Sequence, residues 1–119
     1  MSTQFINYKG YKIIYSDYRN KSGTDLIKSL YEERDFFLNL NDEQKYLKLS
    51  DFRGAYTTTE FMSLVKKIGK DTIVPKTHKA SILGVEGIKK VLFKAYVLFT
   101  GDPSQPFDSE IEAKEWLIR

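Results

Sequence analysis

The chain has 119 residues, a net charge of +3, 41% hydrophobic residues and no cysteine. Its length fits one domain, residues 1–119, around a single hydrophobic core, and its apolar content excludes a disordered chain. The absence of cysteine excludes disulfides, thiolate metal sites and cysteine nucleophiles. No stretch approaches the ~20 apolar residues of a membrane span, and residues 1–20 lack the apolar core of a signal peptide. We therefore expect a soluble cytoplasmic protein.

The positive charge is concentrated in the middle of the chain. Residues 66–94 contain eight lysines against Asp71 and Glu86, whereas residues 1–60 balance nine basic residues with nine acidic ones. Such a basic segment attracts anions, including phosphoryl groups, anionic lipid and acidic protein surfaces. The simpler interpretation is a solvated helix surface. The segment is not an arginine-rich groove with interleaved aromatic residues, so no nucleic-acid partner is expected.

The first part of the chain predicts a hairpin, a helix and a further strand. In chain order these elements cover residues 4–8, 11–17, 25–39 and 45–51. Lys9-Gly10 is suited to the two-residue hairpin turn, and Thr24 is a candidate cap of the helix. In the last of these strands Leu47 and Leu49 point to one face and polar residues to the other. This alternation is typical of a half-buried strand.

The second part predicts three more helices and two strands. They cover residues 57–69, 78–84, 86–99, 105–108 and 109 to the end. The pairs Thr57 with Glu60 and Ser109 with Glu112 have the spacing of capping boxes. The helix over 86–99 is nearly apolar all round in its last turns, which indicates either deep burial or a surface offered to a partner.

The order of the predicted elements favours an α/β fold. Strands that alternate with helices pair in parallel through right-handed crossovers. We therefore expect an open, mostly parallel sheet of four or five strands, with an N-terminal hairpin and about four helices chiefly on one face.

Three segments carry a resemblance to a known family. They are LKLSDFRGAYTTTEFMSLV, ILGVEGIKKVLFKAYVLFTG and PFDSEIEAKEWLI. Together with the element order, they resemble the STAS domain family, the SpoIIAA-like fold of bacterial anti-sigma-factor antagonists. The resemblance covers roughly residues 10–119. It implies an open βα superhelix that acts as a non-enzymatic regulatory module, without a cofactor, and binds a kinase, an anti-sigma factor or another signalling protein.

The resemblance also implies a phosphorylation switch. In the antagonists, a partner kinase phosphorylates one Ser or Thr at the start of the helix that follows this strand, and the complex dissociates. The matching candidates for phosphorylation or partner binding are Ser50, Asp51, Tyr56, Thr57, Thr58 and Thr59. The family pattern is altered here, because Tyr56 stands near its Asp position and Glu60 and Phe61 replace small residues. A helix N-terminus is suited to hold a phosphate, although the plainer role of Thr57 is to cap the helix.

The alternative is a carrier or sensor of a small apolar or anionic ligand, such as a lipid or a nucleotide. An apolar body would lie between the sheet and the helices, and Lys66, Lys67 and Lys70 would bind an anionic head group.

Enzymatic and metal-binding functions find little support in the sequence. Nucleophile elbows, Walker patterns and dinucleotide fingerprints are absent. Asp17 and Asp51 end predicted strands, where two carboxylates can hold Mg²⁺, but residues at such places are more often turn formers. With a single histidine and no cysteine, we expect no metal site and no enzyme.

Overall fold

The computed structural model describes residues 1–119 and has a five-stranded sheet in an α/β fold. The strands are β1 (Thr3–Tyr8), β2 (Tyr11–Asp17), β3 (Tyr46–Asp51), β4 (Thr77–Leu83) and β5 (Ser104–Phe107). They follow one another across the sheet in chain order. β1 runs antiparallel to β2, and every other neighbouring pair is parallel. The predicted open, mostly parallel sheet with an N-terminal hairpin is confirmed.

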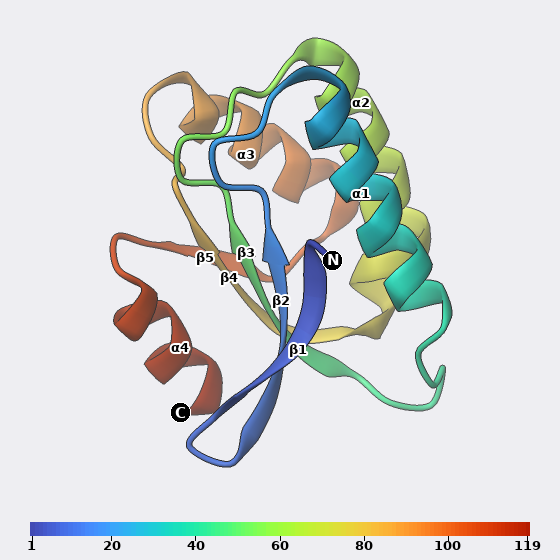
Figure 1. Cartoon of the computed structure of the whole chain (residues 1–119), viewed down its shortest axis with the longest axis vertical. Coiled ribbons are helices and arrows are strands. Elements are labelled where there is room, and N and C mark those ends of the chain that lie inside the picture. Colours follow the sequence, from blue (N-terminus) through green and yellow to red (C-terminus); the bar gives the residue numbers. More distant parts are fainter.

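Four α-helices cover the two faces of the sheet, three on one face and one on the other (Figure 1). They are α1 (Gly23–Leu38), α2 (Thr59–Ile68), α3 (Ile88–Thr100) and α4 (Glu110–Ile118), and two short helical turns join α2 to β4. Right-handed crossovers that advance in one direction place their helices on one face of the sheet. Accordingly α1, α2 and α3 share a face, whereas α4 follows the last strand and packs on the other (Figure 1). None of these helices combines the length and apolar character that crossing a bilayer requires.

The alternation of side chains along the strands divides the core into two clusters. Ile14 belongs to the larger cluster, which lies between the sheet, α1 and α2. Its neighbour Ile13 belongs to the smaller one, with Leu49, Leu83 and Leu117 beneath α4. The single helix α4 therefore covers a face that would otherwise expose a row of apolar side chains to water.

The central strand β3 is buried on both faces. Leu49 lies beneath α4, while Lys48 and Ser50 point to the opposite face and are buried as well. The prediction of a half-buried strand is wrong, because the alternation of polar and apolar residues reflects two different covered faces here. Polar side chains on such a strand need partners within the protein.

Two helix starts differ from the predicted ones. Ser22, not Thr24, is the N-cap of α1, and its side chain makes no capping hydrogen bond. The N-cap of α2 is Thr58, whose hydroxyl accepts a hydrogen bond from Phe61 N at 3.1 Å. The capping-box spacing with Glu60 predicts Thr57. Thr57 is instead half-buried and lines a cavity, and the Thr58 hydroxyl is the one placed to accept from Phe61 N.

Two further helix ends agree with the prediction, whereas α3 begins at Ile88 rather than at residue 86. Ser109 is the predicted N-cap of α4: its hydroxyl accepts from Glu112 N at 3.2 Å, and it donates to Glu112 Oε1 at 2.9 Å in place of the backbone N–H bond of a full capping box. At the end of α3, Gly101 takes a left-handed conformation with φ 72° and donates to Val97 O at 2.8 Å.

Gly84 provides a test of how closely β3 and β4 approach each other. A methyl group at Gly84 would collide with the backbone of Phe52 and Arg53, whereas one at Gly10 would meet nothing within 4 Å. Both glycines have φ +85°, so the left-handed strain is the same. We expect Gly10→Ala to lower the free energy of unfolding by about 1–2 kcal/mol, and Gly84→Ala by at least about 3 kcal/mol. Urea unfolding of the two variants measures this difference, and equal losses would contradict the close approach.

Candidate functional site

The hydroxyl candidates differ in their access to solvent. Tyr56, Thr58 and Thr59 are exposed in the loop between β3 and α2 and at the start of this helix. Thr57 is half-buried and lines a cavity. Ser50 is buried beneath the helices, and its hydroxyl accepts a hydrogen bond from Lys48 Nζ at 2.9 Å. Of the serine and threonine candidates, Thr58 and Thr59 are therefore the ones that a kinase can reach in the folded protein.

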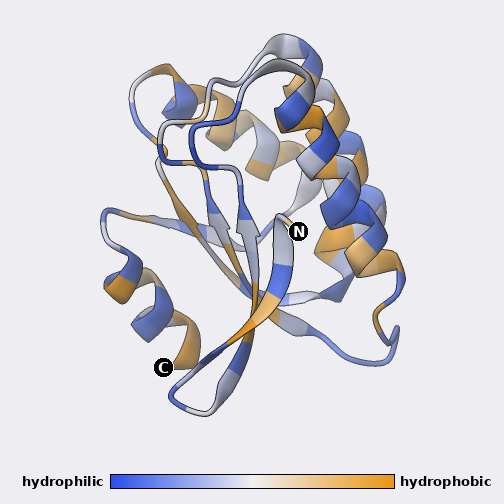
Figure 2. Cartoon of the chain, viewed as in Figure 1, coloured by the Kyte–Doolittle hydropathy of each residue, from blue (hydrophilic) through white to orange (hydrophobic).

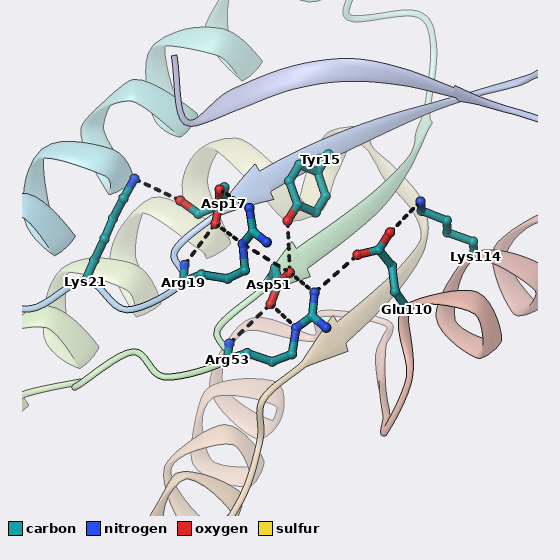
Figure 3. A network of polar contacts seen from close by, with 8 residues as sticks. All are labelled: Tyr15, Asp17, Arg19, Lys21, Asp51, Arg53, Glu110 and Lys114. Atoms are coloured by element: carbon teal, nitrogen blue, oxygen red, sulfur yellow. Dashed lines mark hydrogen bonds and ion pairs between the residues drawn. The ribbon is translucent and has the colours of Figure 1, made fainter.

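Asp51 is the centre of a polar network at the carboxyl ends of β2 and β3 (Figure 3). Its side chain is fully buried. Arg53 holds both carboxylate oxygens, with Nε 2.9 Å from Oδ1 and an Nη atom 2.6 Å from Oδ2. The Tyr15 hydroxyl donates to Oδ2 at 2.9 Å. Burial raises the pKa of Asp51, but the hydrogen bonds from Arg53 and Tyr15 outweigh it and keep this pKa below its ordinary value.

Asp17 is held in the same way by its own arginine. Arg19 donates to both Asp17 oxygens at 3.0 Å, and its hydrogen bond is the main cause of the lowered pKa of Asp17. Arg53 of the other pair also donates a hydrogen bond from an Nη atom to Glu110 Oε1 of α4 at 3.2 Å. No group of three or more potential metal ligands occurs in the structure. The two strand-end carboxylates thus bind arginines, and their network joins β2, β3 and α4.

The lysines suggested as anion-binding residues lie outside the cavity. They occupy the last turn of α2 and the turn after it: Lys66, Lys67 and Lys70. Lys70 Nζ lies 5.0 Å from the centre of the Phe99 ring on α3. These residues therefore add positive charge beside α3, and different lysines, Lys48 and Lys89, line the cavity.

The cavity lies between the sheet, α2 and α3 and has a volume of about 70 Å³. Its walls are mostly apolar, with contributions from Phe52, Phe61, Met62, Val65, Leu92 and Phe93. Its buried end is polar and contains Glu33, Lys48, Tyr96, Asp102 and Ser104. Concave sites of this kind, with apolar walls and a few convergent polar groups, are typical of small-molecule binding sites.

Glu33 of α1 is the least satisfied of the polar groups in the cavity. It is only 3% exposed. Tyr18 donates to its Oε1 at 2.6 Å, whereas Oε2 has no hydrogen-bond partner. Lys48 Nζ lies 3.6 Å from Oε2, within range of an ion pair but too far for a hydrogen bond. Burial, followed by the charge of Glu33, raises the pKa of Tyr18 well above its ordinary value, so this hydroxyl stays protonated.

Both carboxylate oxygens of Asp102, in contrast, accept hydrogen bonds. The Tyr96 hydroxyl donates to Oδ2 at 2.5 Å, and the backbone and side chain of Ser104 donate to Oδ1 at 2.8 and 2.5 Å. Burial, followed by the charge of Asp102, raises the pKa of Tyr96 well above its ordinary value. The buried end of the cavity therefore has one carboxylate with saturated hydrogen bonds and one with a free acceptor atom.

The charged residues of this cavity are not among the candidates that the sequence suggests, although two of them carry a signal in it. Glu33 stands at a core position of the α1 repeat, since Leu26, Leu30 and Phe37 share its side of the helix at helical spacing. Lys48 stands among the alternating residues of a central strand. A charged residue at a core position indicates either an internal partner or a site.

The outer side of α3 exposes a row of apolar side chains. Ile88, Val91 and Leu98 are 71%, 63% and 87% exposed, and with Ala95 they follow the spacing of one helix face. Phe99 lies beside this row and is also exposed. Figure 2 shows the apolar character of α3 in orange. The helix is buried through its opposite side, by Tyr96 and Thr100.

Compared with known proteins, the sequence matches no family model and no curated protein.

The Asp51 network predicts a pH-dependent loss of stability. Because the pKa of Asp51 is lower in the folded than in the unfolded protein, its contribution is present above about pH 4 and is lost as the pH falls through the folded-state pKa. We expect Asp51→Asn to lower the free energy of unfolding at pH 7 by about 2–4 kcal/mol, and by less at pH ~3. The control is Asp35→Asn, which removes an exposed ion pair and should change stability by less than about 1 kcal/mol. Urea unfolding at both pH values measures this, and a loss independent of pH would contradict the assignment.

The capping role of Thr58 predicts unequal effects of neighbouring substitutions. Thr58→Ala removes the acceptor for Phe61 N, so we expect a loss of about 1 kcal/mol in the free energy of unfolding. Thr59→Ala removes a side chain that makes no capping hydrogen bond, so it should change the free energy of unfolding by less than about 0.5 kcal/mol. Thermal or urea unfolding distinguishes them. A larger loss for Thr59→Ala would show that the helix starts elsewhere.

Proposed function

We propose that the chain is a non-enzymatic, STAS-like regulatory module that binds an acidic protein partner through the outer face of α3. The observation that carries the proposal is the exposed row Ile88, Val91, Ala95 and Leu98. Single exposed apolar side chains are common, but a contiguous row on one helix face is typical of an interaction surface. The element order and the three STAS-like segments support the choice of a regulatory module.

The charges beside this row favour an acidic partner. Lys90 and Lys94 are exposed on α3 itself, and Lys70 reaches Phe99 at the end of the helix. The same lysines would repel one another if two copies of the chain met through α3. A partner segment with apolar residues on one side and Asp or Glu beside them complements both features.

Phosphorylation at the start of α2 gives this module a switch. The exposed candidates are Thr58 and Thr59, and the helix N-terminus stabilises a phosphate through its free N–H groups. The loop before α2 adjoins α3, because Lys89 Nζ of α3 lies 3.4 Å from Phe52 O. A phosphate at Thr58 or Thr59 would add negative charge at the start of α2, which packs against α3, and charge repulsion would weaken binding of an acidic partner. Ser50 and Asp51 would support this region from within the fold.

The proposal predicts that a charge in the apolar row blocks binding. Leu98→Asp should reduce the affinity for the partner at least about tenfold, because it places a carboxylate among apolar contacts. Ile111→Asp is the matched control, since Ile111 is 69% exposed on α4, on the other face of the sheet. Affinity capture from the host identifies the partner by mass spectrometry, and titration of the purified partner with each variant measures the affinity. Binding should also weaken as salt is raised above about 0.1 M.

Three results would contradict this proposal. One is equal binding by Leu98→Asp and the wild type. The second is self-association of the wild type that Leu98→Asp abolishes in sedimentation, because the occupant of the row would then be a second copy. The third is a bound partner whose interacting segment is basic.

A further inference from the structure

The cavity beneath α3 contains a buried hydrogen-bond acceptor that the protein does not satisfy. Glu33 Oε2 is buried and has no hydrogen-bond partner; Lys48 Nζ lies 3.6 Å away as an ion pair, and the other oxygen of the same carboxylate is bound by Tyr18. Leaving such an atom without a donor is costly, and native proteins seldom do so without a functional reason. A bound molecule that brings an N–H or O–H donor would remove this cost.

The charges at the buried end favour a donor with a positive charge. Glu33 and Asp102 are two carboxylates, and Lys48 is the one cation among the buried lining residues. Lys48 does not satisfy Glu33, because its Nζ donates to Ser50 and remains 3.6 Å from Oε2. The formal charge of this end is therefore −1. A buried charge of this kind is stabilised by a cation that both pairs with it and donates a hydrogen bond.

The remaining lining limits the rest of the molecule. Phe61, Met62, Val65 and Phe93 make apolar walls that suit an alkyl or aryl body. A volume of about 70 Å³ holds roughly five water molecules, since each needs about 10–15 Å³ by this measure. Lys89 lines the outer part of the cavity, and its charge disfavours a second cationic group there.

We propose that this cavity binds a small organic monoamine, with its ammonium group at Glu33 Oε2 and its apolar body between α2 and α3. The ammonium group supplies the missing hydrogen-bond donor and balances the charge of the buried end. This site goes beyond the proposed partner surface, because it lies on the inner side of α3 and uses none of the exposed row.

A matched series of probes tests both the donor and the charge. Butylamine, butanol and butyrate share a four-carbon skeleton and differ in the head group. We expect butylamine to shift the amide signals of residues that line the cavity in two-dimensional NMR titrations at pH 7. We also expect it to bind at least about tenfold more tightly than butyrate. Hydrochloride and sodium salts at matched pH and ionic strength keep solution conditions equal.

Variants of the chain identify the group that recognises the amine. Glu33→Gln keeps the size of the side chain and removes its charge, so it should reduce the affinity for butylamine about tenfold. Glu43→Gln makes the same chemical change at an exposed loop position and should leave the affinity unchanged. Val65→Phe fills the apolar part of the cavity and should weaken all three probes. This variant keeps the test decisive if Glu33→Gln does not fold.

Several results would overturn the proposal. Butyrate that binds as tightly as butylamine would make Lys48, not Glu33, the recognising group. Unchanged butylamine affinity in folded Glu33→Gln or in Val65→Phe would place the amine elsewhere, and the absence of shifts at tens of millimolar would exclude the site. Leu98→Asp should bind butylamine like the wild type, so failure of the partner proposal and failure of the amine site are distinguishable.

Discussion

Burial of β3 on both faces is the constraint on which the polar interior depends. A strand covered by α4 on one face and by three helices on the other cannot leave its polar side chains to water. Lys48 therefore forms an ion pair with Glu33 of α1. Asp51 accepts hydrogen bonds from Tyr15 of β2 and from Arg53 of the following loop. The polar residues of one strand thus connect it to a neighbouring strand, a helix and a loop.

Two buried carboxylates show opposite outcomes of this constraint. Asp51 receives hydrogen bonds from Arg53 and Tyr15, so it is best understood as a structural group that joins strand ends. Glu33 receives one hydrogen bond, and its second oxygen has none although a lysine is close by. The difference in hydrogen bonding, rather than in residue type or burial, separates a carboxylate that stabilises the fold from one that is suited to binding.

The helix α3 contributes to both proposed sites through opposite sides. Its inner side, with Phe93 and Tyr96, closes the cavity, and its outer side exposes Ile88, Val91 and Leu98. Apart from three lysines, α3 is apolar on both sides, which suits a helix that meets two apolar environments. Because the two sides are separate, a substitution on one side changes one site and leaves the contacts of the other in place.

The sequence by itself determined the main elements, their order and the mostly parallel sheet, because hydrophobic spacing, turn residues and crossover rules are local or nearly so. It also determined the Ser109 N-cap of α4, which needs only residues three apart. Tertiary structure decided which threonine caps α2, because Thr57 is half-buried at the cavity and Thr58 accepts from Phe61 N. It also decided which side of α3 is exposed, since an apolar helix carries no pattern that distinguishes its sides. The pairing of Glu33 with Lys48, and the acceptor atom it leaves unsatisfied, depended on contacts between distant segments, which no local pattern encodes.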